Sequence, residues 1–164
     1  MEQTVTVIVE IPKGSRNKYE MDHETGRIKL DRMLFTSMQY PADYGFIEGT
    51  LGGDGDPLDA LVFVAEPTFP GCEIDARPIG VLQMHDQNGD DEKILTVPVS
   101  DPHWNQMHEL EEIPSGMRLE IEHFFAVYKD LEAGKESHID GWGDSKAAWR
   151  FIEEARARGS DRAR

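Results

Sequence analysis

Alternating apolar and polar positions near the start of the chain predict a β-strand with one buried face. Residues 5–11 alternate in this way, so this strand would turn one face to a core while Glu10 emerges from the other. A hairpin is expected next, because strand-like runs at 18–21 and 27–30 flank a polar turn. Gly26 ends that turn at a position suited to positive φ.

Further short apolar runs follow in the middle of the chain. They cover residues 58–65, 79–84 and 94–99, and the last two bracket a polar turn at 86–93. Short strands separated by turns, without regular alternation with helices, favour a small antiparallel β-barrel or sandwich.

Helical periodicity is confined to the last third of the chain. Apolar residues recur three and four apart over residues 117–131, with Ser115 as the expected N-cap. A second helix is expected from residue 144 or 145 to 158, with Gly159 beyond its end. No repeat or linker interrupts the chain, so we expect one domain over residues 1–164, with about the last five residues frayed.

The charge balance excludes several classes of function. The 164 residues hold 32 Asp and Glu against 17 Lys and Arg, a net charge of −15. Such a chain is poorly suited to bind nucleic acid or an anionic membrane, and no apolar run approaches the ~20 residues of a spanning helix. The single cysteine, Cys72, fits a reducing compartment, and the first residues lack a signal-peptide layout. We therefore expect a cytoplasmic protein without nucleic-acid or membrane partners.

The densest group of candidate catalytic residues is the segment 52–59, Gly-Gly-Asp-Gly-Asp-Pro-Leu-Asp. Asp54, Asp56 and Asp59 stand so close in sequence that their carboxylates would repel one another unless protonated or neutralised by a hard cation such as Mg²⁺ or Ca²⁺. Asp and Gly are also ordinary turn residues, so a solvated acidic turn is the alternative. An EF-hand is excluded, because Ala65 stands where that loop needs a glutamate.

Other segments carry weaker signals when each is taken alone. The acidic segment 86–93 has the polarity of an ordinary hairpin tip. Tyr40 and Tyr44 lie in a segment that does not have a helical pattern, and either could be a core aromatic. The chain has no P-loop that would indicate a nucleotide site.

Taken together, these segments resemble one family over essentially the whole chain, the soluble (family I) inorganic pyrophosphatases of bacterial type. The signature is Asp-x-Asp-Pro-x-Asp at residues 54–59. The other matching segments lie in register with it: 10–12, 18–20, 31–32, 40–46, 77–80, 86–93 and 123–132. The resemblance implies a mainly β (α+β) fold, a small antiparallel OB-like β-barrel flanked by two main helices.

The resemblance also implies roles for individual residues. Several Mg²⁺ ions per active site, for which Mn²⁺ or other divalent cations can substitute, would be held by six carboxylates: Glu10, Glu20, Asp54, Asp59, Asp86 and Asp91. A second group would bind the phosphate oxygens or support the side chains that do: Lys18, Arg32, Tyr44, Tyr128 and Lys129, with Tyr40 and Lys93 in support. Asp56 has the position of the general base, with Asp91 as the alternative.

The implied reaction is Mg²⁺-dependent hydrolysis of inorganic pyrophosphate to two orthophosphates by a metal-activated water. The site would hold seven carboxylates and four cationic side chains, so the pyrophosphate anion would be repelled until divalent cations bind. Relatives of this length resemble hexamers, which implies a homohexamer.

Two other functions stay open on the sequence. One is hydrolysis of a larger phosphoanhydride such as a nucleoside triphosphate, against which the missing P-loop counts. The other is an acidic Ca²⁺-binding or oligonucleotide-binding barrel. A module that bound only metal would have no use for Lys18, Arg32 and Lys129 among the carboxylates.

Overall fold

Five strands close into a small barrel, as predicted, in the computed structural model, which describes residues 3–162. The barrel strands are β1 (Val5–Ile11), β4 (Asp43–Ile47), β5 (Asp59–Val62), β8 (Lys93–Pro98) and β6 (Glu73–Asp86). They pair in that order, and β6 returns to pair with β1, which closes the ring. The expected antiparallel arrangement holds for every neighbour in this ring except β5 and β8, which run parallel.

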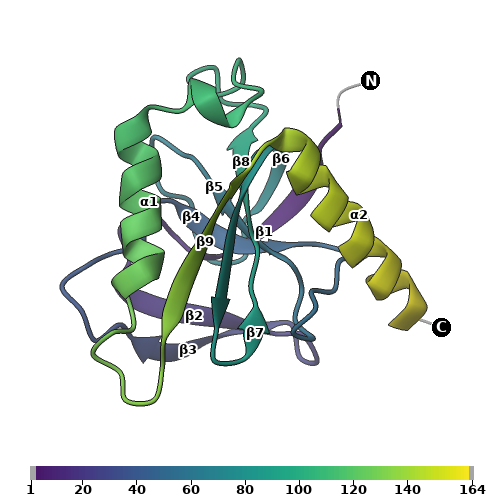
Figure 1. The fold of residues 1–164 in the computed structure, drawn as a ribbon. Helices are drawn as coiled ribbons and strands as arrows, with labels where there is room; N and C mark the ends of the chain where they lie inside the picture. The colour runs from purple at the N-terminus through teal and green to yellow at the C-terminus, as the bar shows by residue number, and fades with distance from the viewer. Residues whose placement is uncertain (1–2, 163–164) are drawn as a thin grey trace.

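Shorter elements extend the barrel at one end. A separate two-stranded sheet is formed by β2 (Asn17–Asp22) and β3 (Arg27–Met33), the predicted hairpin, with Gly26 at φ +71°. Two further strands pair with the end of β6: β7 (Gly89–Asp90) and β9 (Ser137–Gly143). In Figure 1 the β2–β3 sheet lies below the barrel, and the tip between β6 and β7 points toward it.

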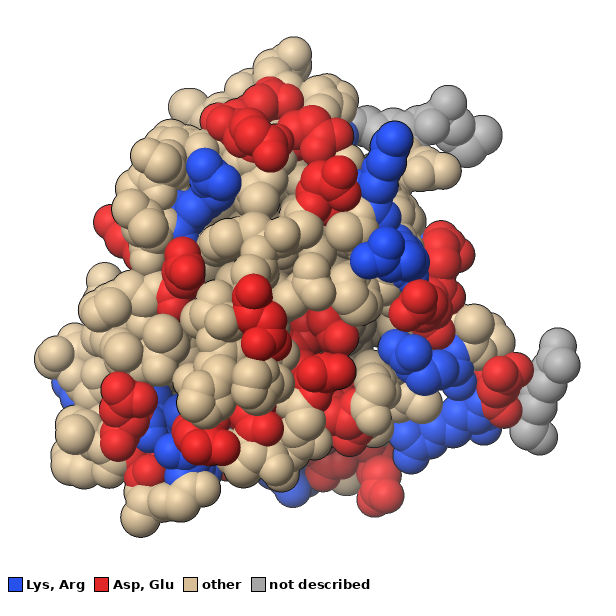
Figure 2. Space-filling view, in the orientation of Figure 1, with Lys and Arg blue, Asp and Glu red and all other residues tan. Residues whose placement is uncertain are grey.

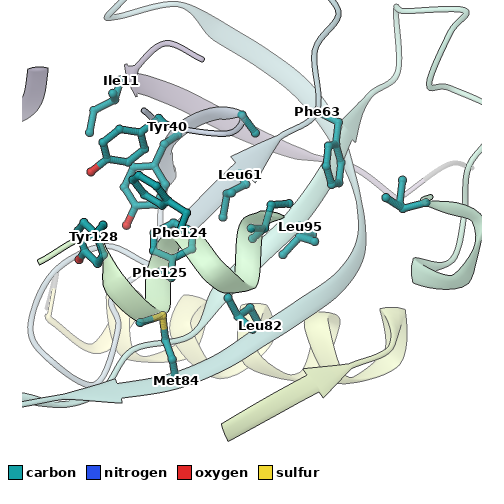
Figure 3. Packing of buried hydrophobic residues seen from close by; sticks show 14 of the residues in the cluster. Ile11, Tyr40, Leu61, Phe63, Leu82, Met84, Leu95, Phe124, Phe125 and Tyr128 are labelled. Carbon is teal, nitrogen blue, oxygen red and sulfur yellow. The ribbon is translucent and has the colours of Figure 1, made fainter. Parts of the chain in front are cut away.

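Two α-helices cover the barrel on opposite sides (Figure 1). The first, α1 (Ser115–Val127), follows a 3₁₀ turn at Leu110–Glu112 and buries Ile121, Phe124 and Phe125. Figure 3 shows Phe124 and Phe125 in one aromatic group with Tyr40 and Tyr128, beside the aliphatic core of the barrel. The second helix, α2 (Ser145–Arg162), buries a row of small and branched residues against a second core: Ala148, Ile152 and Ala155.

Several predicted strands have different limits in the structure. The run predicted at 79–84 is part of β6, which is much longer and shifts register near Pro78. The run at 58–65 is a strand only over Asp59–Val62. Strand β4 gave no alternating pattern because all five of its residues are buried, so both of its faces are apolar or tightly packed.

Both predicted helices also need correction at their ends. The first ends at Val127 rather than at Leu131, which lies in a turn with its side chain 63 % exposed. Its N-cap is Pro114, whose carbonyl accepts the Met117 N–H at 3.0 Å, so the expected Ser115 cap is wrong. The second helix does not stop before Gly159.

The second helix continues to the end of the described chain. It runs through Gly159 to Arg162, so residues 160–162 are helical, and the rest of the segment expected to fray lies outside the described residues. The helix begins at Ser145, one of the two expected starts, and Asp144 caps it by accepting the Ala147 N–H at 2.9 Å. No helix within residues 3–162 is both long and apolar enough to cross a membrane.

Candidate active site

A polar cleft of about 430 Å³ opens at the end of the barrel near the β2–β3 sheet. Of the predicted site residues, all but Tyr40 line it. Seven carboxylates and five cationic side chains face this cleft, because Lys135 joins the four cations expected from the sequence. Residues far apart in sequence therefore meet in one place, which the solvated-turn interpretation of segment 52–59 does not account for.

Strand β2 and its partner β3 place two cations opposite each other. Lys18 and Arg32 are cross-strand partners in this sheet. Between them lies Asp31, whose Oδ2 is 3.2 Å from Lys18 Nζ and 2.6 Å from Arg32 Nη1. Arg32 is also held by both oxygens of Glu132, at 2.6 Å from Nε and 3.1 Å from Nη2. These ion pairs fix the direction of the Arg32 guanidinium before any substrate arrives.

Glu10 joins the β2–β3 sheet to the barrel. Its Oε2 accepts the Met21 N–H at 2.7 Å, and the residue is 9 % exposed rather than projecting into solvent as the strand pattern predicted. Burial raises the pKa of Glu10 to about 7, although the Met21 N–H opposes that shift. The strand pattern failed here because the second sheet covers the face of β1 that carries Glu10.

The loop before β5 presents Asp54 and Asp56. Two backbone hydrogen bonds close it: Gly52 N–H to the Asp56 carbonyl at 2.5 Å, and Gly55 N–H to the Gly52 carbonyl at 3.1 Å. Gly55 has φ +92°, a conformation that other residues rarely adopt. Asp54 Oδ1 accepts the Asp56 N–H at 3.1 Å, and burial, with help from neighbouring carboxylates, raises the Asp54 pKa.

Lys93 is the buried centre of the site. Its Nζ donates to the Tyr44 hydroxyl at 2.8 Å, to Asp59 Oδ2 at 2.9 Å and to Asp91 Oδ2 at 3.0 Å. It also lies 5.1 Å from the ring centre of Phe125. Burial works to lower the pKa of Lys93, but Asp59 and Asp91 outweigh it and raise the pKa well above its ordinary value, so the ammonium stays charged.

The turn after α1 supplies the opposite wall of the cleft. Tyr128 is the C-cap of the helix, with its N–H donating to the Phe124 carbonyl at 2.8 Å, and both Tyr128 and Lys129 line the cleft. Lys129 Nζ donates to Asp86 Oδ2 at 3.2 Å and lies 5.5 Å from the centre of the Tyr128 ring. Asp86 stands near the tip of β6, and although its partial burial acts upward, the Asn88 N–H and Lys129 lower its pKa.

Tyr40 lies behind the cleft instead of in its wall. Its ring packs 5.4 Å from the Tyr44 ring and 4.8 Å from the Phe124 ring, centre to centre, and it is 2 % exposed. This location fits the expected supporting role through Tyr44, and it gives Tyr40 no place in the cleft wall.

Several residues of the site escaped the sequence analysis. Asp31 and Glu132 lie within matching segments, yet nothing in their spacing shows that they hold Arg32 from two sides. His23, Gln87, Asn88 and Lys135 also line the cleft. His23 is an exposed turn residue, and its ring packs edge-on against Phe46 at the cleft wall. Whether such a residue lies at the cleft depends on which turns meet in space, and the spacing of residues along the sequence does not show that.

The donor set fits hard divalent cations. Among residues 3–162 no three carboxylate or imidazole groups already form an enclosing cage, and two of the candidate ligands, Asp59 and Asp91, are held by Lys93 instead. Mg²⁺ rarely needs such a cage, because it keeps several waters and takes one or two carboxylates together with phosphate oxygens. The carboxylates around the cleft are oxygen donors of this kind, so the residues fit Mg²⁺ better than a metal that needs nitrogen or sulfur ligands.

Comparison with known proteins gives a consistent result. A family model described as inorganic pyrophosphatase matches residues 7–160. The inorganic pyrophosphatase of Leifsonia xyli is 58 % identical over 147 residues, 90 % of each chain, and that of Streptomyces coelicolor is 56 % identical over 94 % of this chain and 95 % of its own. The crystal structure of the Thermus thermophilus inorganic pyrophosphatase superposes with a TM-score of 0.93 at 43 % identity, covering 96 % of this chain and 91 % of that one. These similarities confirm the resemblance seen in the sequence, and the chain belongs to the soluble, family I inorganic pyrophosphatases.

Proposed function

We propose that this protein hydrolyses inorganic pyrophosphate to two orthophosphates and needs Mg²⁺ to do so. The observation that carries the proposal is the meeting of five cationic side chains with seven carboxylates in one cleft. Cationic side chains suit a small polyanion, and the excess of carboxylates suits divalent cations that accompany it. Family membership supports the same substrate.

The cations and tyrosines would hold the phosphate oxygens. Lys18, Arg32 and Lys129 reach the cleft from two walls, and their acidic partners keep them in place without removing their charge. The Tyr44 hydroxyl accepts a hydrogen bond from Lys93, which leaves its own proton free to donate to a phosphate oxygen. Tyr128 would be a second hydroxyl donor from the opposite wall.

The carboxylates would hold the metal ions. Glu10, Glu20, Asp54, Asp59, Asp86 and Asp91 are the ligands that we propose, acting directly or through water. Bound Mg²⁺ would lower the pKa of a coordinated water and neutralise charge on the phosphates. Lys93 would hold Asp59 and Asp91 together while the site is being filled.

Asp56 is the candidate proton acceptor. Its carboxylate faces the cleft and forms no ion pair with another described residue, whereas the alternative, Asp91, is held by Lys93 at 3.0 Å. A carboxylate without an ion-pair partner can orient a water and take its proton, whereas Asp91 Oδ2 already accepts a hydrogen bond from Lys93.

Phosphate release from pyrophosphate, measured with Mg²⁺ and in excess chelator, tests the proposal. We expect turnover with Mg²⁺ and none in chelator, and we expect D56N to lower kcat by about 10²–10⁴ while its circular dichroism spectrum is unchanged. D75N, at an exposed position on β6 outside the cleft, is the matched control and should behave as the unmodified protein. Rapid hydrolysis in chelator, or equal release from a nucleoside triphosphate, would contradict the proposal.

We also propose that the protein is a cytoplasmic homohexamer, as the family resemblance implies. Large apolar side chains at several separate positions are more than half exposed in the single chain: Leu30, Met33, Phe35, Phe69, Leu119 and Leu131. Assembly would remove some of this apolar surface from water. Sedimentation velocity should show one species near six times the chain mass, and a stable monomer at working concentration would refute the hexamer.

A further inference from the structure

The loop that carries Asp54 and Asp56 is docked on the C-terminal half of α2. Both backbone polar groups of Leu51 are bonded to this helix: its N–H donates to the Ala155 carbonyl at 2.9 Å, and its carbonyl accepts Arg158 Nε at 2.8 Å. Figure 1 shows the segment between β4 and β5 passing beside α2 on the right of the molecule.

A third hydrogen bond joins the helix to the loop at its tip. Arg162 Nη1 donates to the Gly55 carbonyl at 3.4 Å, and Gly55 stands between Asp54 and Asp56. The loop is therefore held from outside on both sides of Asp54, in addition to its own turn hydrogen bonds.

Gly159 lets the helix come this close. A Cβ at this position would lie 2.9 Å from the Gly49 carbonyl oxygen, a backbone atom that cannot easily move aside. Glycine is a poor helix former, and α2 nevertheless continues through it to Arg162. Close contact with the loop explains why the helix has glycine at this point.

We propose that Arg158 and Gly159 are positioning residues for the metal site, which set the loop in the place where Asp54 and Asp56 can act. The inference rests on the proposed function. Asp54 and Asp56 lie on an exposed loop, and without the external bonds their positions would depend on the turn alone. Residues that orient metal ligands usually change metal affinity by about 10–100-fold when they are removed.

The direct test is Mn²⁺ binding to the metal-free protein, measured by calorimetry without substrate. We expect R158M and G159A each to raise the Mn²⁺ Kd roughly tenfold. The Mg²⁺ concentration for half-maximal pyrophosphate hydrolysis should rise in parallel, and kcat at saturating Mg²⁺ should fall far less than in D56N, since Asp56 is kept and neither residue would touch substrate.

Two control variants separate this role from a general loss of stability. R156M removes the same charge from the same helix, at a residue bonded to Glu153 instead of to the loop. G116A adds a methyl group to a helical glycine with nothing within 4 Å. Both should keep the Mn²⁺ affinity of the unmodified protein. All variants are compared well below their melting temperatures. If R158M or G159A does not fold, R162M takes its place. R162M removes only the longest of the three hydrogen bonds, so it should raise the Mn²⁺ Kd in the same direction but by less.

The outcomes separate this inference from the proposed function. If the unmodified protein binds Mn²⁺ and hydrolyses pyrophosphate while R158M and G159A bind Mn²⁺ like the controls, the positioning role is wrong and the proposed function stands. If the unmodified protein neither binds Mn²⁺ nor releases phosphate, the proposed function is wrong and the positioning role falls with it. A parallel rise in Kd for R158M and G159A, absent from both controls, supports the inference.

Discussion

At the scale of single residues, Lys93 shows how a buried charge can organise a site. Its ammonium is almost fully enclosed, and it satisfies two carboxylates and one hydroxyl at once. Removing one partner of a buried ion pair leaves the others buried and uncompensated, which costs more than the pair contributes. We therefore expect the stability of the fold and the arrangement of the candidate site to depend on the same side chain.

Replacing Lys93 by methionine tests this dependence. In chelator, K93M should lower the free energy of unfolding by about 3–5 kcal/mol, because Asp59 and Asp91 lose their cation. Mg²⁺ should recover part of the loss by supplying positive charge to the same carboxylates. Urea denaturation with and without Mg²⁺ measures both effects. The control is K146M, at an exposed position on α2, which should leave the free energy of unfolding almost unchanged. Equal stability of K93M and the unmodified protein would contradict the argument.

Glu10 links the site to pH. Its carboxyl keeps a proton up to about pH 7 in the folded protein, whereas an ordinary glutamate loses it near 4.5. Between these values the folded state binds more protons than the unfolded state, so the free energy of unfolding falls as pH rises. The shift corresponds to a fall of roughly 3 kcal/mol that is complete above pH 7.

Replacing Glu10 by glutamine should remove this fall. Gln keeps an acceptor oxygen for the Met21 N–H but does not ionise, so E10Q in chelator should gain stability relative to the unmodified protein as pH rises from 4.5 through 7. Urea titrations across this range measure the difference. Parallel pH curves for the two proteins would show that Glu10 ionises normally in the folded state.

At the scale of elements, close backbone contacts explain features that the residue pattern leaves obscure. Gly45 lies in β4 opposite Val9, and a Cβ there would lie 1.9 Å from the Ile8 carbonyl oxygen. Strand β4 carries Tyr44 next to this point and connects directly to the Asp54 loop. The glycine thus allows two barrel strands to approach closely at the mouth of the site.

Adding a methyl group at Gly45 should therefore separate β1 from β4. We expect G45A to lower the free energy of unfolding by about 3 kcal/mol or more, because backbone atoms must move. G53A, where a Cβ would have nothing within 4 Å, is the control for stability and should change it little. A chemical denaturation series gives both values, and a G45A protein as stable as G53A would disprove the contact.

The sequence predicted elements well where one face is apolar and poorly where it is not. Strand β1 and the β2–β3 hairpin alternate clearly and were predicted close to their observed limits. Strand β9 was not predicted, since its first residues are polar, and the structure pairs it with β6 so that the exposed His138 stacks beside His85. The extension of α2 past Gly159 was missed, because a glycine that ends a helix and one that permits a close contact look alike in sequence.

The candidate site was predictable for a different reason. The predicted carboxylates, cations and tyrosines fall in segments whose spacing matches a known family, and all of them except Tyr40 line one cleft. The residues that orient them were not predictable in the same way. Arg32 is held by Asp31 and Glu132, and the Leu51 carbonyl is held by Arg158. No local sequence pattern distinguishes these three charged residues from ordinary surface charges.

At the scale of the whole molecule, the net charge of −15 surrounds the cleft with an uneven field. Figure 2 shows Asp and Glu spread over the face in view from top to bottom, while many Lys and Arg lie along α2 on the right. Such a field attracts divalent cations to the molecule and repels a free polyanion. Metal binding should thus be helped by charges well beyond the ligands themselves.

Salt should weaken metal binding if this long-range attraction matters. The screening length falls from about 10 Å at 0.1 M to about 3 Å at 1 M ionic strength, so distant carboxylates lose their influence while direct ligands keep theirs. We expect the Kd of the metal-free protein for Mn²⁺ to rise several-fold over this range of NaCl. A small chelator measured in the same buffers gives the part due to ion activity alone. If the protein shows no larger change than the chelator, the 24 acidic residues of the described chain that lie outside the cleft contribute nothing to metal capture and serve other ends, such as solubility.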